Sequence, residues 1–351
     1  MYKKFFMGIA AMAALTLVSC SSDDLNSLSG TPSKNEAISF DSYLGRSAVS
    51  VNGSRGSVLE IADLKASTDG FGVFGNYSST DGVAYGSNLF DNQKVTCSST
   101  NNKWEYTPVK YWSPQGHIDF LAYAPRVDRT TLNGSSIDFT VSSTIADQKD
   151  LLWANATNQT KTDNPVKFTF KHALAKIGYS VKTNTAYTGA TITLKKITLA
   201  GSADGTTKAF YAAGTIDLSK TSSTDLWTIS NPNTKLNFDW LSTDKTLDSD
   251  TKKSGTEYLF VIPQDFSKTT ENADALFVIV EYTIKYGDEK AVTNTVSSQL
   301  KQKLEQGKAY SINLTLGLTP IEFDADVTIW NDINLLPLHL ETSLNELVNG
   351  C

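Results

Sequence analysis

Short runs in which hydrophobic and polar residues alternate recur along most of the chain. They lie at residues 38–40, 71–74, 118–124 and 137–141 in the first half, and at 166–170, 177–181, 190–199, 258–262, 276–286 and 310–316 in the second. Clusters of Gly, Asn, Asp and Ser separate the runs, and helical periodicity is missing over most of the chain. A period of two residues predicts strands with one buried face. The pattern therefore predicts an all-β protein built from antiparallel sandwiches that keep one face in water.

The length of the patterned region predicts two domains. About 315 residues follow residue 36, and roughly 150 residues is the usual share of one domain. The polar stretch 157–165 separates an apolar run at 150–154 from the strand that we expect to begin at residue 166. We therefore expect an N-terminal sandwich over residues 37–163, a C-terminal sandwich over 164–330, and an extension over 331–351.

The N-terminus has the pattern of a bacterial lipoprotein signal. Two lysines precede an apolar run at residues 5–18, which is too short to span a bilayer. The sequence Leu-Val-Ser-Cys at 17–20 then places a small residue before Cys20, whose sulfur can take a lipid. We expect residues 1–19 to be removed and Cys20 to anchor the mature chain to a membrane. A secretory signal followed by a chance cysteine is the alternative.

The residues after the signal predict a flexible tether and an acidic mature protein. Residues 20–36 are assigned to the tether, because 25–36 are rich in Ser, Asn, Gly and Pro and have too little apolar surface to order themselves. Loss of the two signal lysines moves the formal charge from −6 to −8. This acidic balance argues against nucleic acid as a partner.

The sequence contains no motif for catalysis or metal binding. His117, His172 and His339 lie far apart, and none has the spacing of a metal site. A nucleophile elbow, a phosphate-binding loop and a dinucleotide fingerprint are all missing. Beside Cys20, the chain has Cys97 and Cys351, which are too few for a disulfide framework. We expect no cofactor and no enzymatic activity.

Several segments follow one another in an order that is typical of one family. They are ISF at 38–40, FGVF at 71–74, VKYWSP at 109–114, IDFLAY at 118–123, DLL at 150–152, VKFTFKHALAKI at 166–177, FVIPQ at 260–264, GKAY at 307–310 and VTIW at 327–330. With the lipoprotein signal, these segments resemble the fimbrillins of Bacteroidales, the precursors of type V pilus subunits. The acidic run Ser-Ser-Asp-Asp at 21–24 also resembles the surface-export signal of Bacteroidota lipoproteins.

The resemblance implies a fold and a location. We expect two transthyretin-like antiparallel β-sandwich domains in tandem. We expect the precursor at the cell outer membrane as a surface-exposed lipoprotein, and the mature subunit in a fimbria. The implied partners are other fimbrial subunits, the outer membrane through the lipid, and a ligand on a host or bacterial surface.

The resemblance also implies assembly by donor-strand exchange. An arginine-specific or trypsin-like protease cuts near the mature N-terminus, the first strand leaves, and a strand of another subunit pairs with the exposed sheet edge. Residues 38–40 are the expected first strand, and Arg46 is the expected cleavage site. Arg55, which lies among Gly and Ser residues, is the second candidate. The alternative for both is a surface arginine that is never cut.

The C-terminal extension supplies the candidate donor strand. Its large apolar residues are Ile333, Leu335, Leu336, Leu338 and Leu340. The last three alternate with Pro337 and His339, as in a strand with one buried face. Pro337 lacks an N–H and is tolerated only at a sheet edge. A short helix over residues 343–348, capped by Ser343, is an alternative or a sequel to that strand.

Three classes of function are therefore open. The first, which we expect, is a structural or adhesive fimbrial subunit. The second is an uncleaved surface lipoprotein or tip adhesin that binds glycan or host protein. The third is a hydrolase of surface polysaccharide, which needs paired carboxylates in a cleft that the sequence does not identify.

Overall fold

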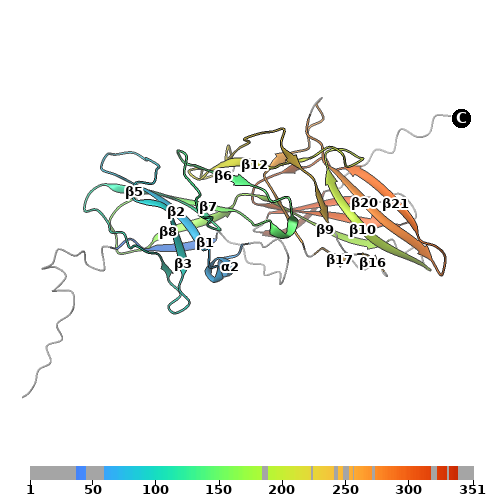
Figure 1. The fold of residues 1–351 in the computed structure, drawn as a ribbon, viewed down its shortest axis with the longest axis horizontal. Coiled ribbons are helices and arrows are strands. Elements are labelled where there is room, and N and C mark those ends of the chain that lie inside the picture. Colours follow the sequence, from blue (N-terminus) through green and yellow to red (C-terminus); the bar gives the residue numbers. More distant parts are fainter. Residues whose placement is uncertain are drawn as a thin grey trace, which may run out of the picture.

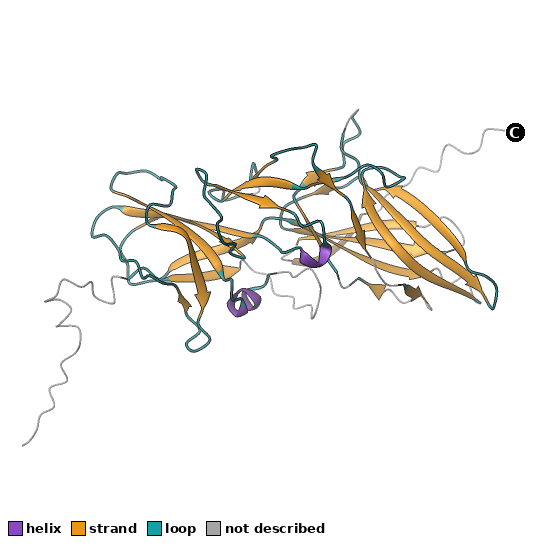
Figure 2. Ribbon diagram, in the orientation of Figure 1, coloured by secondary structure: helices purple, strands orange, loops and turns teal. Residues whose placement is uncertain are grey.

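The computed structural model describes residues 37–44, 59–183, 189–222, 224–240, 244–247, 253–255, 257–270, 273–317, 322–329 and 332–338. The molecule is elongated, with one large sheet at one end and two long sheets at the other (Figure 1). Strands form nearly all of its regular structure, and the helices are short (Figure 2). The prediction of an all-β protein is confirmed.

The first sheet has seven strands in the order β1-β8-β7-β5-β2-β3-β4. Its members are β1 (Phe40–Leu44), β2 (Phe71–Ser78), β3 (Phe90–Cys97), β4 (Trp104–Glu105), β5 (His117–Ala124), β7 (Leu152–Gln159) and β8 (Val166–His172). Helix α2 (Ile61–Ala66) precedes β2 and packs beside β3, and the short 3-10 helix η2 (Ile145–Asp147) precedes β7.

Two long sheets form the other end. One has the order β15-β10-β20-β21, and β16 also pairs with β10. Its strands are β10 (Ala190–Ala200), β15 (Phe238–Trp240), β16 (Lys245–Leu247), β20 (Phe277–Tyr286) and β21 (Val292–Gln299). The other has the order β17-β9-β23-β24-β25, and β18 also pairs with β9. Its strands are β9 (Ala175–Thr183), β17 (Lys253–Ser254), β18 (Leu259–Val261), β23 (Lys308–Leu316), β24 (Glu322–Ile329) and β25 (Asp332–Leu338).

Smaller sheets lie between these ends. The order β13-β12-β6 joins β6 (Ser136–Thr140), β12 (Ala213–Asp217) and β13 (Trp227–Thr228). Two further pairs are β11 (Phe210–Tyr211) with β14 (Lys235–Leu236), and β19 (Gln264–Asp265) with β22 (Lys303–Leu304). In Figure 1, β6 and β12 lie in the middle of the molecule.

The alternating sequence pattern becomes alternating burial in several strands. In β8, buried and exposed residues alternate over all seven positions, and β20 alternates over its first eight. Successive side chains of a strand point to opposite faces of the sheet, so one face packs on the core while the other meets water. Apolar burial on the inner face therefore determines the register of these strands.

The central strands β2 and β5 of the seven-stranded sheet are instead covered on both faces. Phe71 and Phe120 on one face belong to the core of the N-terminal end, whereas Phe74 and Tyr123 on the other belong to a larger core that continues into the C-terminal sheets. In β5, every residue after His117 is buried. The expectation of one solvated face holds for β8 of this sheet but is wrong for β2 and β5, because the second core covers their other face.

The hydrogen bonding does not divide the chain at residues 163 and 164. Strand β8, expected in the second domain, pairs with β1 and β7 in the first sheet, and β6, expected in the first domain, pairs with β12. The polar residues 160–165 are the connection between β7 and β8. A polar turn between neighbouring strands and a linker between domains have similar compositions, so the sequence pattern alone does not separate them.

Candidate assembly site

Strand β1 lies at an edge of the first sheet (Figure 1). Among the described strands it pairs with β8 alone, in parallel, from Phe40 opposite Val166 to Leu44 opposite Phe170. The expected first strand at residues 38–40 therefore overlaps the start of β1. Removing β1 would leave the N–H and C=O groups along one side of β8 without partners.

Phe40 carries the packing of β1. Its side chain is 4% exposed. Ring centroids of Phe71, Phe90, Tyr106, Phe120 and Phe168 lie 5.3 to 6.5 Å from its own. Three of these contacts are edge-on, an arrangement that the charge distribution of aromatic rings favours. Without β1, the sheet edge would border an opening lined by aromatic rings.

The residues just before β1 are held by hydrogen bonds to the loop that follows β4. The Ile38 N–H donates to the Lys110 carbonyl at 2.9 Å, and the Tyr106 hydroxyl donates to the Ile38 carbonyl at 2.7 Å. Burial raises the pKa of Tyr106 to about 12, although a backbone hydrogen bond from Lys110 acts in the opposite direction. The sequence pattern did not single out Tyr106, because nothing in the sequence places residue 106 beside residue 38.

The two candidate cleavage sites lie in the segment that follows β1. Arg46 and Arg55 are both outside the described residues, between Leu44, where β1 ends, and Leu59, where the described chain resumes. A cut after either arginine would disconnect β1 from the rest of the chain. Cleavage at these positions stays a prediction.

The candidate donor residues fall mostly in β25. Ile333, Leu335, Leu336 and Leu338 belong to this strand, and Leu340 lies outside the described residues. Strand β25 pairs antiparallel with β24 at the edge of its sheet, with Leu336 opposite Val327 and Pro337 opposite Asp326. An edge position is where the missing N–H of Pro337 is tolerated. The segment is thus a strand on its own domain, and its exchange between subunits stays a prediction.

A buried pair of a histidine and a carboxylate lies where the first sheet meets the larger core. His172, at the end of β8, places Nδ1 2.7 Å from Oδ2 of Asp150, and the two side chains are 4% and 0% exposed. The same carboxylate oxygen accepts the Leu59 N–H at 3.3 Å. Gln306, from the turn before β23, donates to the His172 carbonyl at 2.6 Å. These groups bind one another and join the two ends of the molecule.

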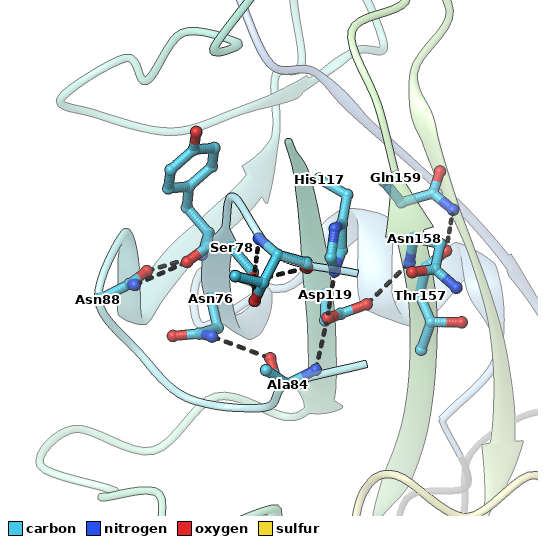
Figure 3. A network of polar contacts seen from close by, with 11 residues as sticks. Asn76, Ser78, Ala84, Asn88, His117, Asp119, Thr157, Asn158 and Gln159 are labelled. Carbon is cyan, nitrogen blue, oxygen red and sulfur yellow. Dashed lines mark hydrogen bonds and ion pairs between the residues drawn. The ribbon is translucent and has the colours of Figure 1, made fainter. Parts of the chain in front are cut away.

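A second buried carboxylate holds the far end of the first sheet (Figure 3). Asp119 of β5 accepts the N–H of Asn158 at 2.8 Å with Oδ1 and the N–H of Ala84 at 2.8 Å with Oδ2. His117 Nε2 lies 3.1 Å from the same Oδ2. Asn76 in turn donates to the Ala84 carbonyl at 3.0 Å. The carboxylate therefore fixes the β2–β3 loop and the end of β7 against β5.

The sequence pattern did not predict that His117 and His172 pair with Asp119 and Asp150. A single acidic residue within the apolar run 118–124 was the available signal for Asp119. Cys97 is a half-buried free thiol whose Sγ lies 3.5 Å from Asn102 Oδ1. Cys20, His339 and Cys351 lie outside the described residues.

The described part of the chain has neither a metal-binding cluster nor a membrane-spanning helix. No group of three or more His, Cys, Asp or Glu side chains there is arranged to hold a metal ion. No helix among the residues described is long and apolar enough to cross a membrane.

These features define an all-β protein whose first strand closes an aromatic core at a sheet edge. A sequence model of the fimbrillin-like family matches residues 60–330, and the chain therefore belongs to the fimbrillin-like family. A search of curated proteins found no match.

One solved structure has the same fold, and another is similar at a lower TM-score. A fimbrial protein from Bacteroides vulgatus is 21% identical, with a TM-score of 0.63, and the match covers 84% of this chain and 99% of that one. A tip fimbrial protein from Porphyromonas gingivalis is 12% identical, with a TM-score of 0.36, over 74% of this chain and 92% of that one.

Proposed function

We propose that this chain is a structural or adhesive subunit of a cell-surface fimbria, assembled by protease-triggered donor-strand exchange. The observation that carries the proposal is the position of β1. It is an edge strand that fills an aromatic core through Phe40, and the segment after it contains Arg46 and Arg55. Cleavage there would make β1 replaceable, and the sheet edge of β8 would accept another strand.

The donor in this proposal is the C-terminal strand of another subunit. Strand β8 alternates buried and exposed side chains, so a strand that replaces β1 must present apolar residues at every second position. The residues Leu336, Leu338 and Leu340 have that spacing. Strand β25 would leave the edge of β24 in one copy and, extended through Leu340, pair with β8 in the next, which yields a homopolymer or a mixed polymer of fimbrial subunits.

Export precedes assembly in this proposal. Cys20 would carry the lipid that anchors the precursor to the outer membrane, and residues 20–36 would form the tether. Both lie outside the described residues. Metabolic labelling with a fatty-acid analogue tests this step, because Cys20→Ser should abolish the label.

The test of assembly is limited proteolysis of the chain from Ser21 onward, followed by light scattering. Trace trypsin should cut after Arg46 or Arg55, which mass spectrometry identifies from the new N-terminus, and rods should then grow. Arg46→Gln combined with Arg55→Gln should block both events. Leu336→Asp with Leu338→Asp should permit cleavage and prevent growth, whereas Thr342→Asp with Ser343→Asp serves as the matched control.

The second candidate function is an uncleaved surface lipoprotein or tip adhesin that binds glycan or host protein. The observation that favours it is β25, which already pairs with β24 of its own domain. A chain that resists trypsin at both arginines and stays monomeric would assign the protein to this class. The first function, donor-strand assembly, would be supported if the unmodified chain is cut and forms rods whereas the Leu336→Asp with Leu338→Asp variant is cut and forms none.

A further inference from the structure

We propose that the free edge of β21 docks a second copy of this chain, so that the β15-β10-β20-β21 sheets of two copies become one continuous sheet. This strand lies at the outer edge of that sheet, at the end opposite β1 (Figure 1). The proposal does not depend on cleavage of the chain or on exchange of β25. It concerns sideways association of intact molecules.

The edge of β21 lacks the features that usually prevent pairing. Eight consecutive residues pair with β20 without a register shift, from Gln299 opposite Phe277 to Val292 opposite Ile284. Among the described strands, β21 has no partner on its other side. Its sequence, VTNTVSSQ, contains no charge and no proline. Proteins that keep an edge unpaired usually place lysine, proline or a bulge on it, or make it short.

The other sheet edges do have such features. Strands β4 and β17 are two residues long, and β15 is three. Strand β25 contains Pro337, and its pairing with β24 has a register shift. Strand β1 is five residues long and contains Asp41. Among the long sheets that the structure describes, β21 is therefore the edge best suited to bind another strand.

Symmetry restricts how two copies of β21 can pair. Two identical strands related by a two-fold axis perpendicular to their sheet run antiparallel, and one residue at the centre faces its own copy. For an eight-residue strand this residue lies near the middle, which is Thr295 or Val296. In both registers, the core-facing sides of the two sheets lie on the same side of the combined sheet. The half-buried Val296 side chains of the two copies would then lie next to each other and continue the apolar side of the sheet from one copy to the other.

The charges at the two ends of β21 fit this arrangement. Glu289 lies in the turn before the strand, and Lys301 and Lys303 follow it; all three are exposed. In an antiparallel pair, the turn 287–291 of one copy lies towards residues 300–303 of the other. The turn contains Asp288, Glu289 and Lys290 and has a net charge of −1, whereas Lys301 and Lys303 give the other segment a charge of +2. Segments of opposite net charge are thus brought together at both ends of the pair, which favours a second copy as the occupant.

The test is sedimentation equilibrium of the uncleaved chain from Ser21 onward, without protease. We expect a monomer–dimer equilibrium. Thr293→Lys with Thr295→Lys places charges on exposed edge positions that contact no core, and should weaken the dimer at least about tenfold. Ser99→Lys with Thr100→Lys adds the same charge to exposed positions of the β3–β4 turn and should change the dissociation constant less than about twofold.

A cysteine experiment tests the register independently. In a chain with Cys97→Ser and Cys351→Ser, the central residue meets its own copy, so Thr295→Cys or Val296→Cys should form a disulfide-linked dimer under mild oxidation and Thr293→Cys should form far less. A chain that stays monomeric up to millimolar concentration would overturn the proposal. A dimer that the edge lysines leave unchanged, with equal crosslinking at all three positions, would also overturn it.

Discussion

The Tyr106 hydroxyl donates a hydrogen bond of 2.7 Å to the carbonyl oxygen of Ile38, across 68 positions of sequence. Tyr106 also contacts Phe40 through its ring, at a centroid distance of 5.3 Å. One side chain thus holds both the backbone and the main apolar residue at the start of the first strand. In the proposed assembly mechanism, this side chain opposes the release of β1.

Replacing Tyr106 with Phe should make β1 easier to release and change the response of the protein to alkaline pH. Burial raises the pKa of Tyr106 from 10.0 to about 12, so the unfolded chain loses this proton first and stability falls as pH rises between these values. Tyr106→Phe should lose about 1 kcal/mol at pH 7 and show a smaller decline above pH 10. Urea unfolding across this pH range measures both effects, and Tyr43→Phe on the exposed side of β1 is the control. An unchanged alkaline decline would contradict the assignment.

Replacing Phe40 with Ala should destabilise the protein and speed the loss of β1. Truncating a fully buried Phe costs about 3–5 kcal/mol, because transfer free energy is lost and a cavity remains. Denaturant unfolding measures the change in the free energy of unfolding. Tyr43→Ala, at a position that is 64% exposed on the same strand, should cost less than about 1 kcal/mol. Similar losses in both variants would show that β1 contributes through its backbone alone.

Replacing His172 with Ala should destabilise the joint between the two ends of the molecule. The variant leaves the carboxylate of Asp150 buried without its ring partner, and breaking a buried pair in this way costs about 3–5 kcal/mol. A double-mutant cycle with Asp150→Asn separates the pairing from the packing. Lys167→Ala, at an exposed position of the same strand, is the control. A cycle with no coupling energy would contradict the role of the pair.

Replacing Asp119 with Asn should loosen the β2–β3 loop while the fold persists. The amide group has one oxygen where the carboxylate has two, so it cannot accept both the Ala84 and the Asn158 N–H groups along with the His117 contact. We expect a loss of about 1–3 kcal/mol and faster hydrogen exchange at the amides of Ala84 and Asn158. Asp81→Asn, exposed on the same loop, should leave both exchange rates unchanged. Faster exchange in both variants would point to the loop rather than to the carboxylate.

The sequence was sufficient to predict the strands and their buried faces, because apolar alternation such as that of Val166, Phe168 and Phe170 follows directly from the geometry of a strand. The sequence was not sufficient to predict which strands pair with one another in each sheet. Whether β8 pairs with β1 or with a later strand depends on contacts between residues far apart in sequence. The parallel pairing of β9 with β23, from Ala309 opposite Lys176 onward, was not predicted for the same reason.

The candidate assembly site was predicted in part. An apolar first strand followed by arginines is visible in the sequence, and the leucines of residues 333–340 are as well. The contacts that hold β1 in place are not visible in the sequence, because Tyr106 and the rings around Phe40 come from segments that are far apart along the chain. Buried polar groups such as Asp150 were also missed, since the sequence shows a charge but not whether a partner lies beside it.

The two faces of the first sheet have a consequence for a molecule that is pulled along its length. Phe74 and Tyr123 stack at 6.1 Å and face the core shared with the C-terminal sheets, whereas Phe71 faces the other core. In the described part of the chain, tension between the two ends is therefore borne by packed aromatic side chains and by the ladder between β6 and β12. Parting the ends would expose apolar surface on the sheet itself, so the hydrophobic effect opposes their separation under load.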